Sequence, residues 1–189
     1  LNGLRPSVAI GYWIGGTPGV GWWRVRAESG GQAVEQTTHV FDFARYLMGE
    51  VTSVYAAGSK GLITDMPNLD IEDGSTVSLT FKSGAVATIL SSCVASQGYG
   101  NGLHIIAKGK NVKIEGDRLI VEEENKITTI KNDNNPYLLE SELFLKAVET
   151  GDKSIIRSPY ADSIKSLEIT LAANQSMDSG EVVKIPEHR

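Results

Sequence analysis

Four side chains capable of proton chemistry recur at helical spacing within residues 30–49. Glu35, His39, Asp42 and Tyr46 stand at i, i+4, i+7 and i+11, so a helix over this stretch places them along one line. Histidine titrates closest to neutral pH, and a carboxylate one turn away can orient its ring. The spacing therefore predicts that His39 and Glu35 form an acid–base pair.

A second interpretation of the same stretch stays open, because the polar side of an amphipathic helix usually faces water. The opposite side reads as core-facing, and it carries Ala33, Thr37, Val40, Phe41, Ala44, Leu47 and Met48. Solvated helix faces favour Lys, Glu, Gln and Arg, whereas here Thr37 and Thr38 precede the histidine. These residue types favour a chemical role for the line without excluding a solvated face.

The approach to this predicted helix is a glycine-rich loop with two adjacent tryptophans. Gly30 and Gly31 allow a close backbone approach before the helix, and Gly49 stands where a helix favours a left-handed residue. The pair Trp22-Trp23, followed by Arg24, forms either a lid over a ligand or an anchor against the core. Both alternatives remain at this stage.

Length and composition limit the class of protein. The chain has 189 residues, 41% of them hydrophobic, which suffices for one compact domain over residues 1–189. Its net charge is −5, and Lys and Arg are scattered, so we expect no nucleic-acid partner. Cys93 is the only cysteine, which excludes an internal disulfide and fits a reducing compartment. No apolar run approaches 18 residues and no leader is visible, so we expect no membrane association and a cytoplasmic location.

Alternating side chains predict a sheet over much of the chain. The expected strands are residues 7–14, 51–59, 75–82, 85–94, 103–107, 111–114, 118–122, 126–130 and 182–185. Helices are expected from Pro136 to Gly151 and from Pro159 to Gly180, each with a proline start and a glycine stop. The fold class is therefore α+β, a large, mostly antiparallel open β-sheet with helices packed on one face.

Several well-known site patterns are absent from the sequence. No G-x-G-x-x-G fingerprint links a strand to a helix, so no Rossmann domain is expected in this chain. His39, His104 and His188 do not pair at metal-ligand spacing, and we expect no metal site. His104 alternates within a strand and is interpreted as a sheet residue. No nucleophile elbow or P-loop occurs.

The order of elements and several local motifs together resemble one family. The motifs are W-W-R at residues 22–24, Gly30-Gly31, an acid four residues before His39, Asp42, Leu47, Gly49, T-F-K-S-G at 80–84, the Gly109 turn, and N-Q-S-M-D-S-G-E-V-V at 174–183. Over nearly its whole length the chain resembles the C-terminal domain of the Gfo/Idh/MocA oxidoreductases, the group of glucose-fructose oxidoreductase and inositol dehydrogenase. The resemblance implies a dihydrodipicolinate-reductase-like C-terminal fold.

The resemblance also implies roles and partners. His39 matches the family's general acid/base, or the residue that orients the sugar hydroxyl, and Glu35 matches the usual Asp with one more methylene. Family members bind NAD or NADP through an N-terminal Rossmann domain, and they use the sheet face in oligomer contacts. The family's E-K-P lysine and its nucleotide-binding half would precede Leu1, which is not a methionine, so we expect the chain to be part of a longer protein.

Two hypotheses about function follow. In the first, the chain is the substrate-binding half of an NAD(P)-dependent dehydrogenase acting on a sugar, cyclitol or similar polyol, and it is inactive alone. Its catalytic residues are then His39 and Glu35, and its candidate substrate-binding residues are Trp23, Arg24 and Asp42. In the second, the same fold is a non-catalytic scaffold that dimerises through its sheet or binds carbohydrate.

Overall fold

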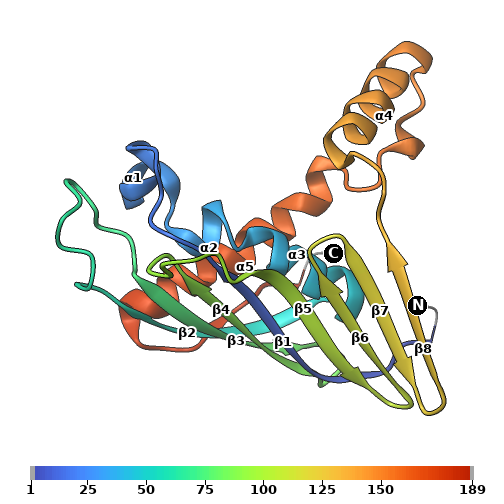
Figure 1. The fold of residues 1–189 in the computed structure, drawn as a ribbon, viewed down its shortest axis with the longest axis horizontal. Coiled ribbons are helices and arrows are strands. Elements are labelled where there is room, and N and C mark those ends of the chain that lie inside the picture. Colours follow the sequence, from blue (N-terminus) through green and yellow to red (C-terminus); the bar gives the residue numbers. More distant parts are fainter. Residues whose placement is uncertain (1–2, 188–189) are drawn as a thin grey trace.

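A computed structural model describes residues 3–187, which form a nine-stranded sheet with helices (Figure 1). The strand order is β8-β7-β6-β5-β1-β4-β3-β2-β9. The strands are β1 (Pro6–Ile14), β2 (Val51–Ser59), β3 (Gly74–Phe81), β4 (Val86–Ser92), β5 (Gly100–Ala107), β6 (Lys110–Glu115), β7 (Arg118–Glu123), β8 (Lys126–Lys131) and β9 (Val183–Lys184). Only β1 and β4 pair in parallel among these described strands. The predicted open, mostly antiparallel α+β fold is confirmed, and His188 lies outside the described residues.

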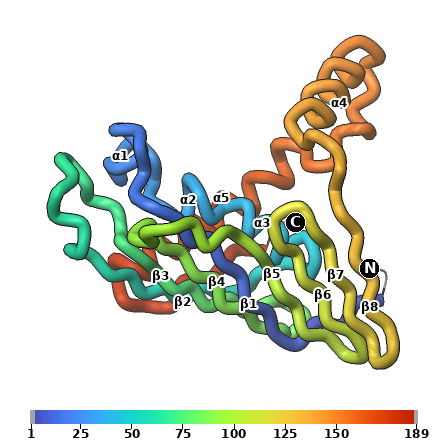
Figure 2. The backbone as a smooth tube through the Cα atoms, in the orientation of Figure 1, coloured from blue at the N-terminus to red at the C-terminus, as the bar shows by residue number. Residues whose placement is uncertain are grey.

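The helical segments gather on one side of the sheet. They are η1 (Trp22–Arg24), α1 (Arg26–Ser29), α2 (Gln32–Glu35), α3 (Thr38–Met48), α4 (Pro136–Thr150), η2 (Lys153–Ile155) and α5 (Tyr160–Ser179). The tube trace shows α2, α3 and α5 lying along the sheet, while α4 projects away from it (Figure 2). The core lies between these three helices and the sheet, as the burial of Val40, Phe41, Ile89 and Leu103 shows.

Close packing of α3 on β1 depends on a small residue in the strand. Gly11 lies on the helix-facing side of β1, and a Cβ atom there would stand 2.6 Å from Val40 Cγ1. The residues on either side of Gly11 along this face are Ala9, which is buried, and Trp13, which is half-buried. This close approach sets where the first turn of α3 lies above the C-terminal part of β1.

The predicted single helix over residues 30–49 is wrong, because the chain breaks at Gln36–Thr37 into α2 and α3. The backbone N–H groups of Gln36 and Thr37 both donate to the carbonyl of Gln32, at 3.1 and 2.9 Å. The buried Thr37 hydroxyl then bonds Ser91 on β4 at 2.7 Å. The bond from Thr37 to the sheet and the i→i+5 bond from Thr37 N–H to Gln32 together override the helical periodicity of the sequence.

Both C-terminal helices end at their predicted glycines, and α4 begins as its signal predicts, whereas α5 begins one residue later than predicted, with Pro159 as an N-cap that makes no side-chain bond. Asn135 caps α4 by accepting from the N–H groups of residues 137 and 138, and Pro136 is its first residue. Gly151 and Gly180 close α4 and α5 in the left-handed conformation. However, only Ala147 is buried in α4, since this helix packs on η2 and not on the sheet.

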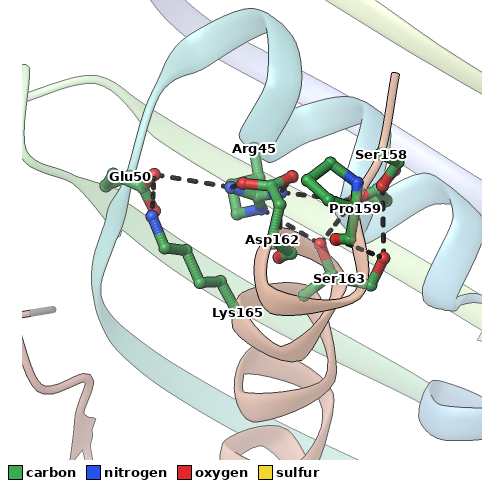
Figure 3. Close-up of polar contacts among 9 residues, drawn as sticks. Arg45, Glu50, Ser158, Pro159, Asp162, Ser163 and Lys165 are labelled. Atoms are coloured by element: carbon green, nitrogen blue, oxygen red, sulfur yellow. Dashed lines mark hydrogen bonds and ion pairs between the residues drawn. The ribbon is translucent and has the colours of Figure 1, made fainter. Parts of the chain in front are cut away.

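The C-terminal turn of α3 is tied to the start of α5 by Arg45, whose side chain is only 7% exposed (Figure 3). Its guanidinium donates to Asp162 and to Ser166, and it lies 3.4 Å from Glu50. Lys165 also bonds Glu50, at 3.3 Å. These groups, Arg45, Glu50, Asp162, Lys165 and Ser166, are called the Arg45 network below.

The face of the sheet that the helices leave uncovered is partly apolar. Exposed side chains on this open face include Val8, Ile10, Val86 and Ile106 on the adjoining strands β1, β4 and β5, and Tyr55 on β2 nearer the edge. Hydroxyl side chains of β3 alternate onto the same face. Among the helices that the structure describes, none combines the length and the apolar character needed to span a membrane.

Candidate functional site

His39 is the second residue of α3, and its side chain is exposed. Its ring lies against the ring of Trp13 from β1, with centroids 5.6 Å apart and planes tilted by 36°. An aromatic face beside an imidazole limits the orientations of the ring and keeps one side of it dry. Trp13 was not predicted as a site residue from the sequence, although it lies on the same side of β1 as Ala9 and Gly11, under the helices.

Glu35 ends α2 and is half-buried. The break after α2 means that Glu35 and His39 are presented by two short helices joined at a turn, and not by one continuous helix. Two contacts hold the chain, one before α2 and one after it. Asn174 of α5 donates its amide to the carbonyl of Gly30 at 2.6 Å, and Thr37 bonds the sheet.

The two tryptophans stack on each other instead of entering the core. The rings of Trp22 and Trp23 are nearly parallel, with centroids 6.0 Å apart and a 13° interplanar angle. Trp22 is 47% exposed, and the buried Nε1 of Trp23 has no hydrogen-bond partner among the described residues. Neither ring belongs to the buried core, so the pair forms a rigid apolar surface on the 22–24 turn.

Arg24 holds the glycine-rich loop. Its Nε donates to the carbonyl of Pro18 at 2.8 Å, and its Nη2 donates to the carbonyl of Gly19 at 3.0 Å. The carbonyl of Arg24 accepts in turn from the N–H of Asp70 at 3.0 Å. These bonds fix the loop before α1 and occupy two donor atoms of the guanidinium.

Asp42 points toward α5. It accepts a hydrogen bond from Ser166 and lies 3.6 Å from Arg45, so it joins the edge of the Arg45 network. Tyr46, the last member of the predicted line, is 82% exposed. The structure therefore places Glu35 and His39 on the two sides of one turn, with His39 against Trp13, and it bonds Asp42 to Ser166 of α5.

His104 lies in β5, as its alternation predicts. Its Nε2 stands 2.8 Å from Glu115 on β6, and its ring makes an edge contact with Tyr12, at a centroid distance of 5.9 Å. Burial raises the pKa of the Tyr12 phenol, and the neighbouring Glu115 carboxylate raises it further. This cluster lies on the sheet, apart from the α2–α3 turn.

The GFO/IDH/MocA C-terminal domain family model matches residues 8–115, more than half of the chain, including Glu35, His39 and Trp13. The chain belongs to this family. Family membership agrees with the fold described above and with the resemblance in the sequence.

Individual relatives agree with this assignment. The chain is 30% identical over 171 residues to a myo-inositol 2-dehydrogenase of Thermotoga maritima, and the match covers 84% of this chain and 50% of that protein. A levoglucosan dehydrogenase structure in complex with NADH and L-sorbose superposes with a TM-score of 0.83 at 19% identity, covering 97% of this chain and 59% of that one. An NAD binding oxidoreductase from Klebsiella pneumoniae gives a TM-score of 0.76 at 16% identity, covering 97% and 60%.

The chain thus spans about half the length of the curated relatives it matches. The structural matches show a shared fold, and their identities of 16–19% carry no more than that.

Proposed function

We propose that this chain is the substrate-binding half of an NAD(P)-dependent oxidoreductase that transfers hydride between nicotinamide and a sugar, cyclitol or related polyol. The observation that carries the proposal is the α2–α3 turn, where Glu35 ends α2, His39 begins the first turn of α3, and the His39 ring lies against Trp13. The myo-inositol 2-dehydrogenase relative and the NADH and L-sorbose complex of the structural neighbour support the substrate class and the cofactor.

The residues of the turn supply the proton half of such a reaction. Oxidation of a carbinol carbon requires its hydroxyl proton to leave, so a base must lie within hydrogen-bond reach of that oxygen. We assign this role to His39, whose ring is exposed and oriented by Trp13. Glu35 orients the imidazole or a neighbouring hydroxyl, and the Trp22–Trp23 surface offers an apolar face for a sugar ring.

The described residues do not fit the pyrophosphate of a dinucleotide. Such a group needs a glycine-rich turn between a strand and a helix N-terminus, and G-x-G-x-x-G is absent from the sequence. The nicotinamide, when bound, supplies the hydride chemistry. We therefore assign the cofactor's phosphates to an N-terminal Rossmann domain and derive no step of the cofactor's chemistry from this chain.

The outer side of α4 supports the presence of such a partner domain. Its side chains Tyr137, Leu138, Phe144, Leu145 and Val148 are each more than half exposed, and their spacing forms one stripe along the helix. A helix with this much bare apolar surface normally packs on another element. α4 rises on the same side of the sheet as α2 and α3 (Figure 1). The matched relative is about twice as long as the matched region, so we assign the stripe as the contact surface for a nucleotide-binding domain.

The open face of the sheet supports a second candidate role, self-association. Val8, Ile10, Val86 and Ile106 form an exposed apolar area on adjoining strands β4, β1 and β5. A homo-oligomer would bury this area through the sheet face. In a non-catalytic scaffold of the same fold, this contact would be the main function of the chain.

The test uses the complete protein that contains this chain, incubated with NAD⁺ or NADP⁺ and a panel of polyols including myo-inositol. The proposal predicts that reduced nicotinamide forms with at least one polyol. The 189-residue chain alone should show little change in tryptophan fluorescence with NADH, because its phosphate site lies elsewhere. Tight NADH binding by the chain alone would contradict the assignment of the cofactor's phosphates to another domain. A complete protein inert toward every polyol would support the scaffold role instead.

A further inference from the structure

We propose that Glu72 is a positioning residue for Glu35 and His39. The expected effect on turnover rests on the proposed function, whereas the effect on the α2–α3 turn rests on the geometry of this chain alone. Glu72 precedes β3 by two residues and is far from α2 in sequence, yet its side chain is 1% exposed and turned toward the start of that helix.

Glu72 supplies the cap that α2 lacks locally. Gly31, at the N-cap position, offers no side chain, and no local side chain bonds the first turn. The Glu72 carboxylate accepts from the backbone N–H of Gln32 at 3.0 Å through Oε1. The carboxylate oxygen thereby pairs a helix N-terminal N–H that has no partner within the helix.

The contact is reciprocal and continues into the turn. The side-chain amide of Gln32 donates to the backbone carbonyl of Glu72 at 2.8 Å. The carbonyl of Gln32 accepts from both Gln36 and Thr37, the two residues that separate α2 from α3. Gln32 therefore connects Glu72 directly to the turn between Glu35 and His39.

The surroundings leave the carboxylate little freedom. A Cβ atom on Gly31 would lie 3.1 Å from Glu72 Oε2, and Gly31 has a φ of +83°, which side chains rarely adopt. The main chain of Glu72 is held as well, because the Cys93 thiol donates to its backbone carbonyl at 3.6 Å. Glu72 is thus held between a glycine that can approach it and a buried thiol.

Two substitutions separate the effect of the length of the Glu72 side chain from the effect of its charge. Glu72→Gln keeps the length of the side chain and an acceptor oxygen, whereas Glu72→Asp keeps the charge but withdraws the carboxylate by one methylene. If Glu72 positions the turn by reaching Gln32, the Gln variant retains the turn and the Asp variant loosens it. Asp73→Asn is the matched control, because Asp73 is also 1% exposed, but its carboxylate accepts from the backbone N–H of Leu62 at 2.7 Å and, among the described residues, makes no bond to α2.

The first readout is amide hydrogen exchange in this chain, with thermal unfolding to confirm that each variant is folded. Glu72→Asp should speed exchange at Gln36 and Thr37 by about tenfold, while Glu72→Gln and Asp73→Asn stay close to wild type. Unchanged exchange at both amides in Glu72→Asp, or equal acceleration in the Asp73 control, would overturn the inference. If Glu72→Asp does not fold, Gln32→Leu, which removes the bond to the Glu72 carbonyl, should give the same local acceleration, and normal exchange there would overturn it.

The second readout is turnover by the complete protein. Displacement of catalytic groups by about 1 Å can cost on the order of 10² in rate, so Glu72→Asp should lower kcat by about 10- to 100-fold with KM for the nicotinamide cofactor unchanged. Glu72→Gln should restore most of this activity. A wild-type protein without turnover would refute the proposed function alone, since the exchange experiment still decides whether Glu72 holds the turn.

Discussion

Replacing Arg45 by Ala should destabilise the chain more than any exposed ion pair can. Arg45 is 7% exposed, and its guanidinium donates to Ser166 at 3.0 Å and to Asp162 at 3.0 Å. Figure 3 shows Arg45 facing Asp162. Breaking a fully buried pair costs about 3–5 kcal/mol. Because the Asp162 side chain is 39% exposed and can be rehydrated, we expect a smaller loss of about 2–3 kcal/mol.

That loss should lower the melting temperature by about 4–12 °C, since about 1 kcal/mol shifts a domain of this size by about 2–4 °C. Arg45→Lys keeps the charge but not the planar fork, so it should recover only part of the stability. Urea unfolding of Arg45→Ala, Asp162→Ala and the double variant gives the coupling between the two groups.

The matched control is Lys82→Ala, because Lys82 pairs with Glu187 at 2.8 Å with both side chains more than two-thirds exposed. It should leave the unfolding transition where it is. If Arg45→Ala falls within about 0.5 kcal/mol of wild type, the Arg45 network does not join α3 to α5 in the way described.

Two further predictions concern titration and thiol chemistry. The hydrogen bond from Arg45 lowers the pKa of Asp162 below its usual 3.8. The Asp162 carboxylate therefore contributes its full stability above pH 3.8 and loses it as the pH falls through the lower pKa of the folded state. Acid unfolding of Asp162→Asn identical to that of the wild type would contradict this. Burial, then Asp73 and Glu72, raises the pKa of Cys93 to about 11, so iodoacetamide at neutral pH should label the thiol only after unfolding. Rapid labelling of the folded chain would show that Cys93 is accessible.

The sheet and the long helices could be predicted because their signals are local. Alternation in residues 75–82 places Val77 and Leu79 on the buried face, and Ser83-Gly84 turns the chain into β4. Asn135 and Gly151 bound α4 through contacts within a few residues of sequence. These signals act within a few residues of chain, so a single sequence is enough to read them.

The details of the site depend on contacts that are distant in sequence, which explains why the sequence predicted them less well. The break between α2 and α3 is bonded to Ser91 and, through Gln32, to Glu72. The contact of His39 with Trp13 joins a helix to a strand 26 positions earlier. Periodicity places Asp42 on the same line as Glu35 and His39, whereas the hydrogen bond from Ser166 links it to α5, 124 positions away in sequence. Contacts of this kind can be identified only from the tertiary structure.

The central claim is that His39 moves the substrate's hydroxyl proton, and substitution of this residue in the complete protein tests it most directly. With a polyol that the wild type oxidises, His39→Ala should lower kcat by about 10² to 10⁴ while cofactor affinity stays nearly unchanged. Turnover by His39→Ala equal to that of the wild type would contradict the claim, and the exposed imidazole would then belong to an ordinary solvated helix face.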